Sequence, residues 1–271
     1  MTRDRALLLE AFIVSNLAFL VLDVFIAHSI NAFRHPAEWI PLVYAAPGAL
    51  VLGANLALRG PWRALDGAWR RGAGRWVGLV VGWGGIAVGI AGLLWHLESG
   101  FFREATLEGL VYAAPFSAPL AFAGLGLLAI LNRLVPPEEP EWGRWVLLLA
   151  WGGFVGCLAL ALGDHAQNGF FRPAEWIAVG AGAAAVAFLA IPLVTRVPRS
   201  YFTVLLGILA LEAAVGVLGF ALHLQPVFDG GTAPLVDRLL YGAPPFAPLL
   251  FTDLALLGAL AAWDLGAKGT T

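Results

Sequence analysis

The stretch AHSINAFRHPAEWIPLVYAAP, at residues 27–47, determines the architecture because related copies of it recur along the chain. The copies read WHLESGFFREATLEGLVYAAP at 95–115, DHAQNGFFRPAEWIAV at 164–179, and LHLQPVF at 222–228 followed by LVDRLLYGAP at 235–244. In each copy an apolar segment ends in a histidine, a polar loop follows, and a second apolar segment begins. Internal repetition of this kind predicts a tandem array of helical hairpins.

Composition places these hairpins in a membrane. The chain is 60% hydrophobic and only 13% charged, whereas a soluble domain is about a quarter charged. Stretches of roughly 20 apolar residues can cross a bilayer, and in lipid they must be helical because each backbone amide needs a partner within its own segment. We therefore expect an all-α polytopic membrane protein with eight transmembrane helices, at about 7–29, 39–58, 76–97, 107–131, 145–163, 176–195, 202–224 and 235–262.

The four hairpins group into two halves. The first and third share Pro-Ala-Glu-Trp at 36–39 and 173–176, whereas the second and fourth share Tyr-x-Ala-Pro at 112–115 and 241–244. Two tandem four-helix halves related by a pseudo-twofold axis along the membrane normal are expected. Their predicted bounds are 1–135 and 145–271, with 136–144 as a cytoplasmic linker.

Basic residues predict the orientation. Of the sixteen Lys and Arg residues, only Arg34, Arg103, Arg172 and Arg238 lie at the histidine ends of the helices. Because basic loops stay in the cytoplasm, both termini are expected there, in a multi-pass protein of the cell membrane (the inner membrane in a bacterium). The histidines then face outward. The bilayer is the expected partner, with other membrane subunits or a redox partner as candidates.

Charge and cysteine content exclude other classes. The net charge of −2 argues against nucleic-acid binding, which needs a basic surface. The single cysteine, Cys157, rules out an intrachain disulfide and CxxC metal sites.

The repeated histidines and acids form two candidate metal sets. If the symmetry axis brings equivalent hairpins together, imidazoles and carboxylates converge into sites suited to Zn, Mn or non-haem Fe. Three tyrosines lie deeper and are candidate cofactor-binding residues, while Pro47, Pro115 and Pro244 should kink their helices and free carbonyls. The first set is His28, Glu38, His165 and Glu175; the second is His96, Glu108, His223 and Asp237; the tyrosines are Tyr44, Tyr112 and Tyr241.

A non-covalent haem is the alternative cofactor, since four histidines at one depth can form two bis-imidazole sites. Two four-helix halves with one histidine pair each resemble the plan of haem A synthases. The signature sequences of that family are absent, and here the histidines close the odd-numbered spans. A structural interpretation also stands: histidine in a last turn and glutamate in a first turn suit the helix dipole, and Trp39 and Trp176 suit an aromatic belt.

Acids inside the apolar helices mark a possible proton path. Glu212 and Asp253 have no counterpart in the other repeats, and intramembrane ionisable groups are functional candidates by default. Asn16 and Asn55 are candidate polar neighbours, and no basic side chain lies within these spans to pair with the acids. A protonated, hydrogen-bonded acid is the structural alternative. Glu10, near the cytoplasmic end of its helix, is expected to be interfacial.

Three functions remain open on sequence alone. The first is a redox or cofactor-maturation protein with a metal or haem at the outer face. The second is a proton-coupled small-solute transporter that uses Glu212 and Asp253. The third is a non-catalytic subunit of a larger membrane complex.

Overall fold

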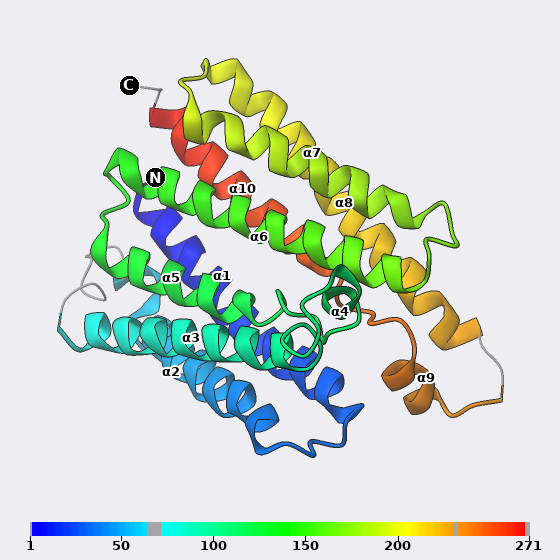
Figure 1. Cartoon of the computed structure of the whole chain (residues 1–271). Coiled ribbons are helices and arrows are strands. Elements are labelled where there is room, and N and C mark those ends of the chain that lie inside the picture. Colours follow the sequence, from blue (N-terminus) through cyan, green and yellow to red (C-terminus); the bar gives the residue numbers. More distant parts are fainter. Residues whose placement is uncertain (1, 64–71, 230–231, 269–271) are drawn as a thin grey trace.

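The computed structural model describes residues 2–63, 72–229 and 232–268, and in these ranges the chain forms helices and no strand (Figure 1). Seven of the described helices are long and apolar enough to cross a bilayer, which indicates a multi-pass membrane protein. The helices are α1 (Thr2–Ser29), η1 (Pro36–Trp39), α2 (Ile40–Arg63), α3 (Gly72–Glu98), α4 (Leu107–Val111), α5 (Leu120–Leu134), α6 (Pro140–Gln167), α7 (Glu175–Val194), α8 (Arg199–Asp229), α9 (Leu235–Tyr241) and α10 (Leu249–Lys268).

The long helices form two four-helix bundles that lie side by side (Figure 1). The first bundle contains α1, α2, α3 and α5, and the second contains α6, α7, α8 and α10. In the first bundle α1 and α3 each pack against α2 and α5, so they occupy opposite corners. In the second bundle α6 and α8 each pack against α7 and α10 and are likewise opposite. Contacts of α5 with α6 and of α1 with α10 join the bundles.

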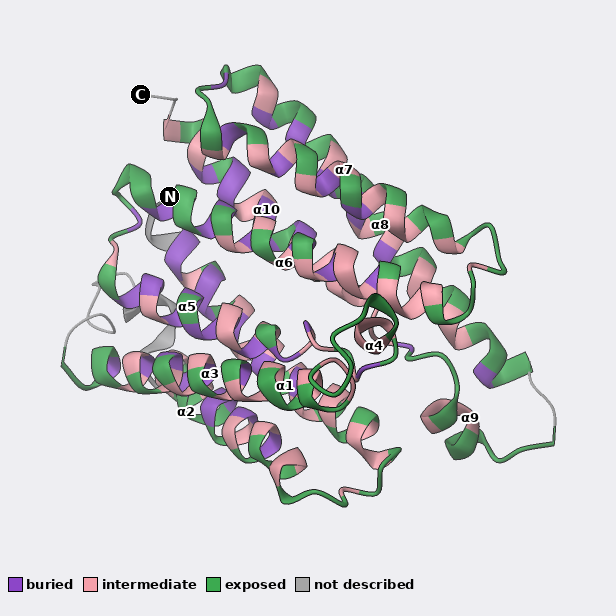
Figure 2. Ribbon diagram, viewed as in Figure 1, coloured by how far each residue is buried: buried purple, intermediate pink, exposed green. Residues whose placement is uncertain are grey.

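Burial follows the helix contacts. The buried residues lie on the faces where helices meet, and much of the outer surface is exposed (Figure 2). Large apolar side chains contribute to that surface: Leu50 is 73% exposed, Val43 68% and Trp83 64%. A water-soluble monomer rarely exposes apolar surface so widely, whereas lipid tails cover such a surface without penalty.

The prediction of continuous helices at 107–131 and 235–262 is wrong. Residues 112–119 separate α4 from α5, and residues 242–248 separate α9 from α10. Prolines lie in both breaks, and proline lacks the amide proton and disfavours helix at the preceding residue. The helix α5 has 15 residues, a rise of about 22 Å, which is shorter than a hydrocarbon core of about 30 Å. The proline residues are Pro115 and Pro119 in the first break and Pro244, Pro245 and Pro248 in the second.

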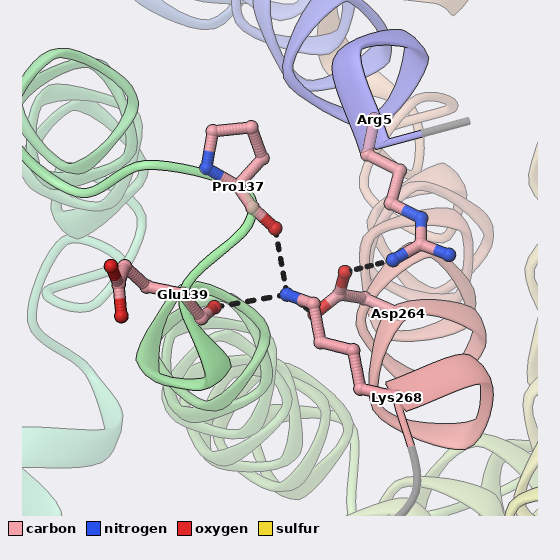
Figure 3. A network of polar contacts seen from close by, with 5 residues as sticks. All are labelled: Arg5, Pro137, Glu139, Asp264 and Lys268. Atoms are coloured by element: carbon pink, nitrogen blue, oxygen red, sulfur yellow. Dashed lines mark hydrogen bonds and ion pairs between the residues drawn. The ribbon is translucent and has the colours of Figure 1, made fainter.

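The connection between the bundles is shorter than the expected linker, because α6 already begins at Pro140. Lys268 on α10 holds this connection: its Nζ donates to the carbonyl oxygens of Pro137 at 2.7 Å and Glu139 at 2.9 Å (Figure 3). The same ammonium pairs with Asp264 at 2.8 Å, and Asp264 also forms an ion pair with Arg5 on α1. The buried carboxylate of Asp264 thus ties both bundles to the connection.

A second buried ion pair lies within the first bundle. The carboxylate of Glu10 is buried and accepts from Arg133 on α5, with Nη1 at 2.7 Å and Nη2 at 2.6 Å. Asn132 adds a donor to the same carboxylate at 3.1 Å. Glu10 is therefore covered by protein on the α1–α5 contact.

Glycines on α3 allow α5 to approach closely. A Cβ built on Gly85 would lie 2.7 Å from the Phe122 carbonyl oxygen, and one on Gly89 would lie 2.7 Å from the Ala123 nitrogen. On α8, a Cβ at Gly219 would similarly lie 2.7 Å from the Cβ of Pro248, the residue before α10. These glycines serve helix packing, which small residues permit in membrane proteins.

Candidate functional site

The four repeated histidines form two pairs, one in each bundle. The ring centroids of His28 and His96 are 6.5 Å apart, and those of His165 and His223 are 6.4 Å apart. Each pair joins opposite corners, α1 with α3 and α6 with α8. The repeat predicts that His28 meets His165 across the two halves, whereas the imidazoles that lie together belong to one bundle.

The helix breaks anchor one histidine of each pair. The Nδ1 atom of His96 lies 2.9 Å from the carbonyl oxygen of Pro115, and that of His223 lies 2.8 Å from the carbonyl oxygen of Pro244. A carbonyl oxygen can only accept, so each Nδ1 carries the proton and each Nε2 keeps its lone pair. The expected role of Pro115 and Pro244, to kink the chain and free carbonyls, thus has a direct consequence at the histidines.

The partner histidines are held from the returning helix. His28 donates from Nδ1 to the backbone carbonyl of Glu38 at 3.0 Å. His165 has its Nδ1 atom 3.7 Å from the carboxylate of Glu175. One carboxylate oxygen of Glu38 is buried and has no hydrogen-bond partner among the described residues. The predicted His–Glu neighbours therefore do lie together, through a backbone oxygen in one bundle and a carboxylate in the other.

An aromatic stack supports each of these loops. Phe33 stacks on Trp39 with centroids 4.3 Å apart, and Phe170 stacks on Trp176 at 4.1 Å. Both phenylalanines have positive φ, 49° and 51°, a conformation that costs a bulky residue free energy and persists only where surrounding contacts hold it. The sequence predicts an aromatic belt for the two tryptophans but not the stack. The signal for the stack is the spacing, since each phenylalanine lies five residues after its histidine.

The other predicted ligands lie apart from the imidazoles or at the surface. Tyr44 donates its hydroxyl to the Val81 carbonyl at 2.7 Å, between α2 and α3. Tyr112 is 65% exposed, and Glu108 on α4 is exposed as well. Asp237 and Tyr241 line an open cavity of about 600 Å³ between α8 and α9, together with His223.

The expected four-ligand metal sites are not assembled. No group of three or more His, Cys, Asp or Glu side chains is placed to hold a metal ion within the described ranges. What remains is a two-imidazole arrangement in each bundle.

The two intramembrane acids lie at the core of the second bundle and at its contact with α1. Asp253 on α10 accepts a hydrogen bond from Asn16 of α1 at 2.9 Å, and Asn16 was one of the two expected polar neighbours. Glu212 on α8 is fully buried, and neither of its carboxylate oxygens has a hydrogen-bond partner in the described part of the chain.

Comparisons with known proteins add no assignment: no family, curated protein or solved structure matches this chain. The class is that of a multi-pass helical membrane protein.

Proposed function

We propose that this protein is a membrane electron-transfer protein that binds one haem in each bundle. His28 and His96 would hold the iron of the first haem, and His165 and His223 would hold that of the second. The observation that carries the proposal is the approach of two imidazoles from opposite corners of each bundle, with centroids 6.5 Å and 6.4 Å apart.

The separation favours haem over a tetrahedral ion. With a metal–nitrogen bond of about 2.0 Å and about 1.2 Å from nitrogen to ring centre, two imidazoles trans to one metal have centroids about 6.4 Å apart. Two imidazoles at a tetrahedral metal would lie only about 5.2 Å apart. The ring planes meet at 47° and 89°.

The hydrogen bonds at Nδ1 suit the same role. A metal-ligating histidine usually donates its other ring nitrogen to a carbonyl or carboxylate, which fixes the tautomer and raises ligand basicity. The acceptors here are the carbonyls of Glu38, Pro115 and Pro244, while His165 faces the Glu175 carboxylate. Each imidazole can thus present Nε2 to iron.

Irregular chain lies beside each histidine pair. At the level of each histidine pair the fourth corner of the bundle is irregular chain, 112–119 or 242–248, and not a packed helix. Irregular backbone at membrane depth is tolerated where protein buries it or where it borders a cavity. When bound, each haem would supply a one-electron carrier, and the bundle residues hold, orient and shield it.

We place the histidine end on the outer side of the cell membrane. Support comes from the basic residues, most of which lie at the opposite ends of the helices. Arg5 and Arg133 are buried in ion pairs, but the sequence from 59 to 75, which runs from the last turn of α2 to the first turn of α3, still contains five arginines. A soluble or membrane-bound redox partner would then dock at the outer face.

The test is haem content after expression with added haem precursor and purification in mild detergent. We expect a Soret band and low-spin spectra, with haem halved by His28→Ala and lost when His165→Ala is added. His35→Ala is the matched control, since His35 only accepts from the Ala37 amide in an exposed cap. Folded protein without a Soret band would reject the proposal. So would zinc or manganese that is lost with the same histidines.

A further inference from the structure

We infer that Glu212 and Asp253 form an intramembrane proton-binding site in the second bundle, in which Glu212 holds a proton and Asp253 exchanges it. The site is independent of the proposed haems, because neither acid touches a histidine pair: Glu212 lies eleven residues before His223 on α8, a rise of about 16 Å.

The first step is the isolation of Glu212. Its side chain is 0% exposed, and both oxygens lack hydrogen-bond partners among the described residues. An ionised carboxylate that is buried without a partner is strongly unfavourable, so the group stays neutral by keeping its proton. We therefore expect the Glu212 carboxyl group to be protonated in the folded protein.

The second step is that Glu212 and Asp253 lie at the same level of two packed helices. Thr252 on α10 donates its hydroxyl to the Ala213 carbonyl on α8 at 2.9 Å. Each residue of this bonded pair is the chain neighbour of one acid, so Glu212 and Asp253 lie at one level of the α8–α10 contact. No charged residue lies at 176–195 on α7, the other helix that packs against α8.

The third step is the route to Asp253. The Asn16 amide of α1 donates to Asp253 across the contact between the bundles at 2.9 Å. Asp253 is half-buried, in contrast to Glu212. The two acids thus lie at one level and differ in burial: the Glu212 carboxyl is sealed in the second bundle, whereas Asp253 reaches the α1–α10 contact, where we expect it to exchange the proton.

The first bundle supplies an internal comparison. The residue eleven positions before His96 is Gly85, and a Cβ there would lie 2.6 Å from the Tyr44 hydroxyl oxygen. Tyrosine from α2 occupies the space that a carboxyl side chain would need. A proton-binding acid at this level is therefore specific to the second bundle.

Infrared spectroscopy of the protein in lipid tests the site without relying on haem. We expect a protonated-carboxyl band at neutral pH that Glu212→Gln removes, that Glu212→Asp restores at a shifted position, and that moves on transfer to D₂O. Asp253→Asn should slow this deuterium shift at least several-fold. The matched control is Glu10→Gln, which should leave the band intact because Glu10 is buried in an ion pair with Arg133.

Each other result would overturn the inference. A spectrum that Glu212→Gln leaves unchanged means that Glu212 holds no proton. A band that never shifts in D₂O means a sealed structural acid. If Asp253→Asn leaves the rate of the deuterium shift unchanged, Asp253 is not part of the proton-binding site. Haem content should be unchanged in all of these variants, so failure here is distinguishable from failure of the haem proposal.

Discussion

The two bundles are alike at the histidine end and differ eleven residues further in. At the histidines both have paired rings, an anchoring proline carbonyl and a Phe–Trp stack. Further in, the first bundle has Gly85 beneath the Tyr44 hydroxyl, and the second has the carboxyl group of Glu212. The two bundles thus share the arrangement of paired histidines and differ at the level of Glu212.

The acids of the interior divide in the same way. Glu10 is buried but paired with Arg133, and Asp264 is buried between Arg5 and Lys268. Glu212 is equally buried and has no such partner among the described residues. Burial alone therefore does not define the proton-binding candidate; burial without a counter-charge does.

The largest effect should come from removing the counter-charge of the first bundle. Arg133→Ala leaves the Glu10 carboxylate buried without its cation, and loss of one partner of a buried pair costs about 3–5 kcal/mol. Chemical denaturation in detergent measures the loss. Arg133→Lys, which keeps the charge, should lose clearly less. Equal losses in the two variants would mean that packing, and not charge, makes Arg133 important.

Gly85→Ala tests the close approach that excludes a side chain from the first bundle. The new Cβ would lie 2.6 Å from the Tyr44 hydroxyl oxygen and 2.7 Å from the Phe122 carbonyl oxygen. Overpacking of this kind costs about 1–3 kcal/mol, measurable as a lower thermal midpoint. Gly124→Ala is the control, since a Cβ there meets nothing within 4 Å. If both variants behaved alike, the contact would not be restrictive.

Glu212→Met should stabilise the second bundle. It replaces an unpartnered polar group with an apolar one of similar size, and such a change gains about 1–3 kcal/mol. The expected result is a higher thermal midpoint together with loss of the protonated-carboxyl band. Glu10→Met should have the opposite effect on stability, because it leaves Arg133 without this carboxylate. A destabilised Glu212→Met protein would indicate that the carboxyl group has a stabilising contact.

The smallest effect concerns the tyrosine that fills the space above Gly85. Tyr44→Phe removes the hydroxyl that donates to the Val81 carbonyl at 2.7 Å, and loss of one such bond costs about 0.5–1.5 kcal/mol. Equilibrium unfolding compares this variant with Tyr112→Phe, whose side chain is exposed and should be neutral. Haem content should not change in either protein, unless Tyr44 contributes to cofactor binding.

Much of the architecture could be predicted from the sequence because repeats and hydropathy are local signals. The repeated hairpin pattern predicts the apolar helices and the histidines at their ends. It also predicts that His28 lies near Glu38 and His165 near Glu175. Pro115 and Pro244 also indicated disturbed helices. The predicted effect was a kink, whereas the helix is interrupted in both segments, which contain two and three prolines.

What could not be predicted depends on which helices occupy neighbouring corners. A repeat identifies His28 and His165 as equivalent, but equivalence is not contact, and the bundle topology places His96 beside His28 instead. Glu10 and Arg133 are 123 residues apart in the sequence, so no local pattern predicts their ion pair. The seal around Glu212 likewise depends on tertiary packing.

The ion pair between Arg5 and Asp264 has a consequence for how the chain is made. The two residues are 259 positions apart, and ribosomes add about 5–20 residues per second, so Arg5 waits roughly 10–50 s for its carboxylate. During that time the guanidinium on α1 lacks its counter-ion. Arrival of α10 neutralises it, so the first bundle acquires this ion pair only after the second bundle has been made.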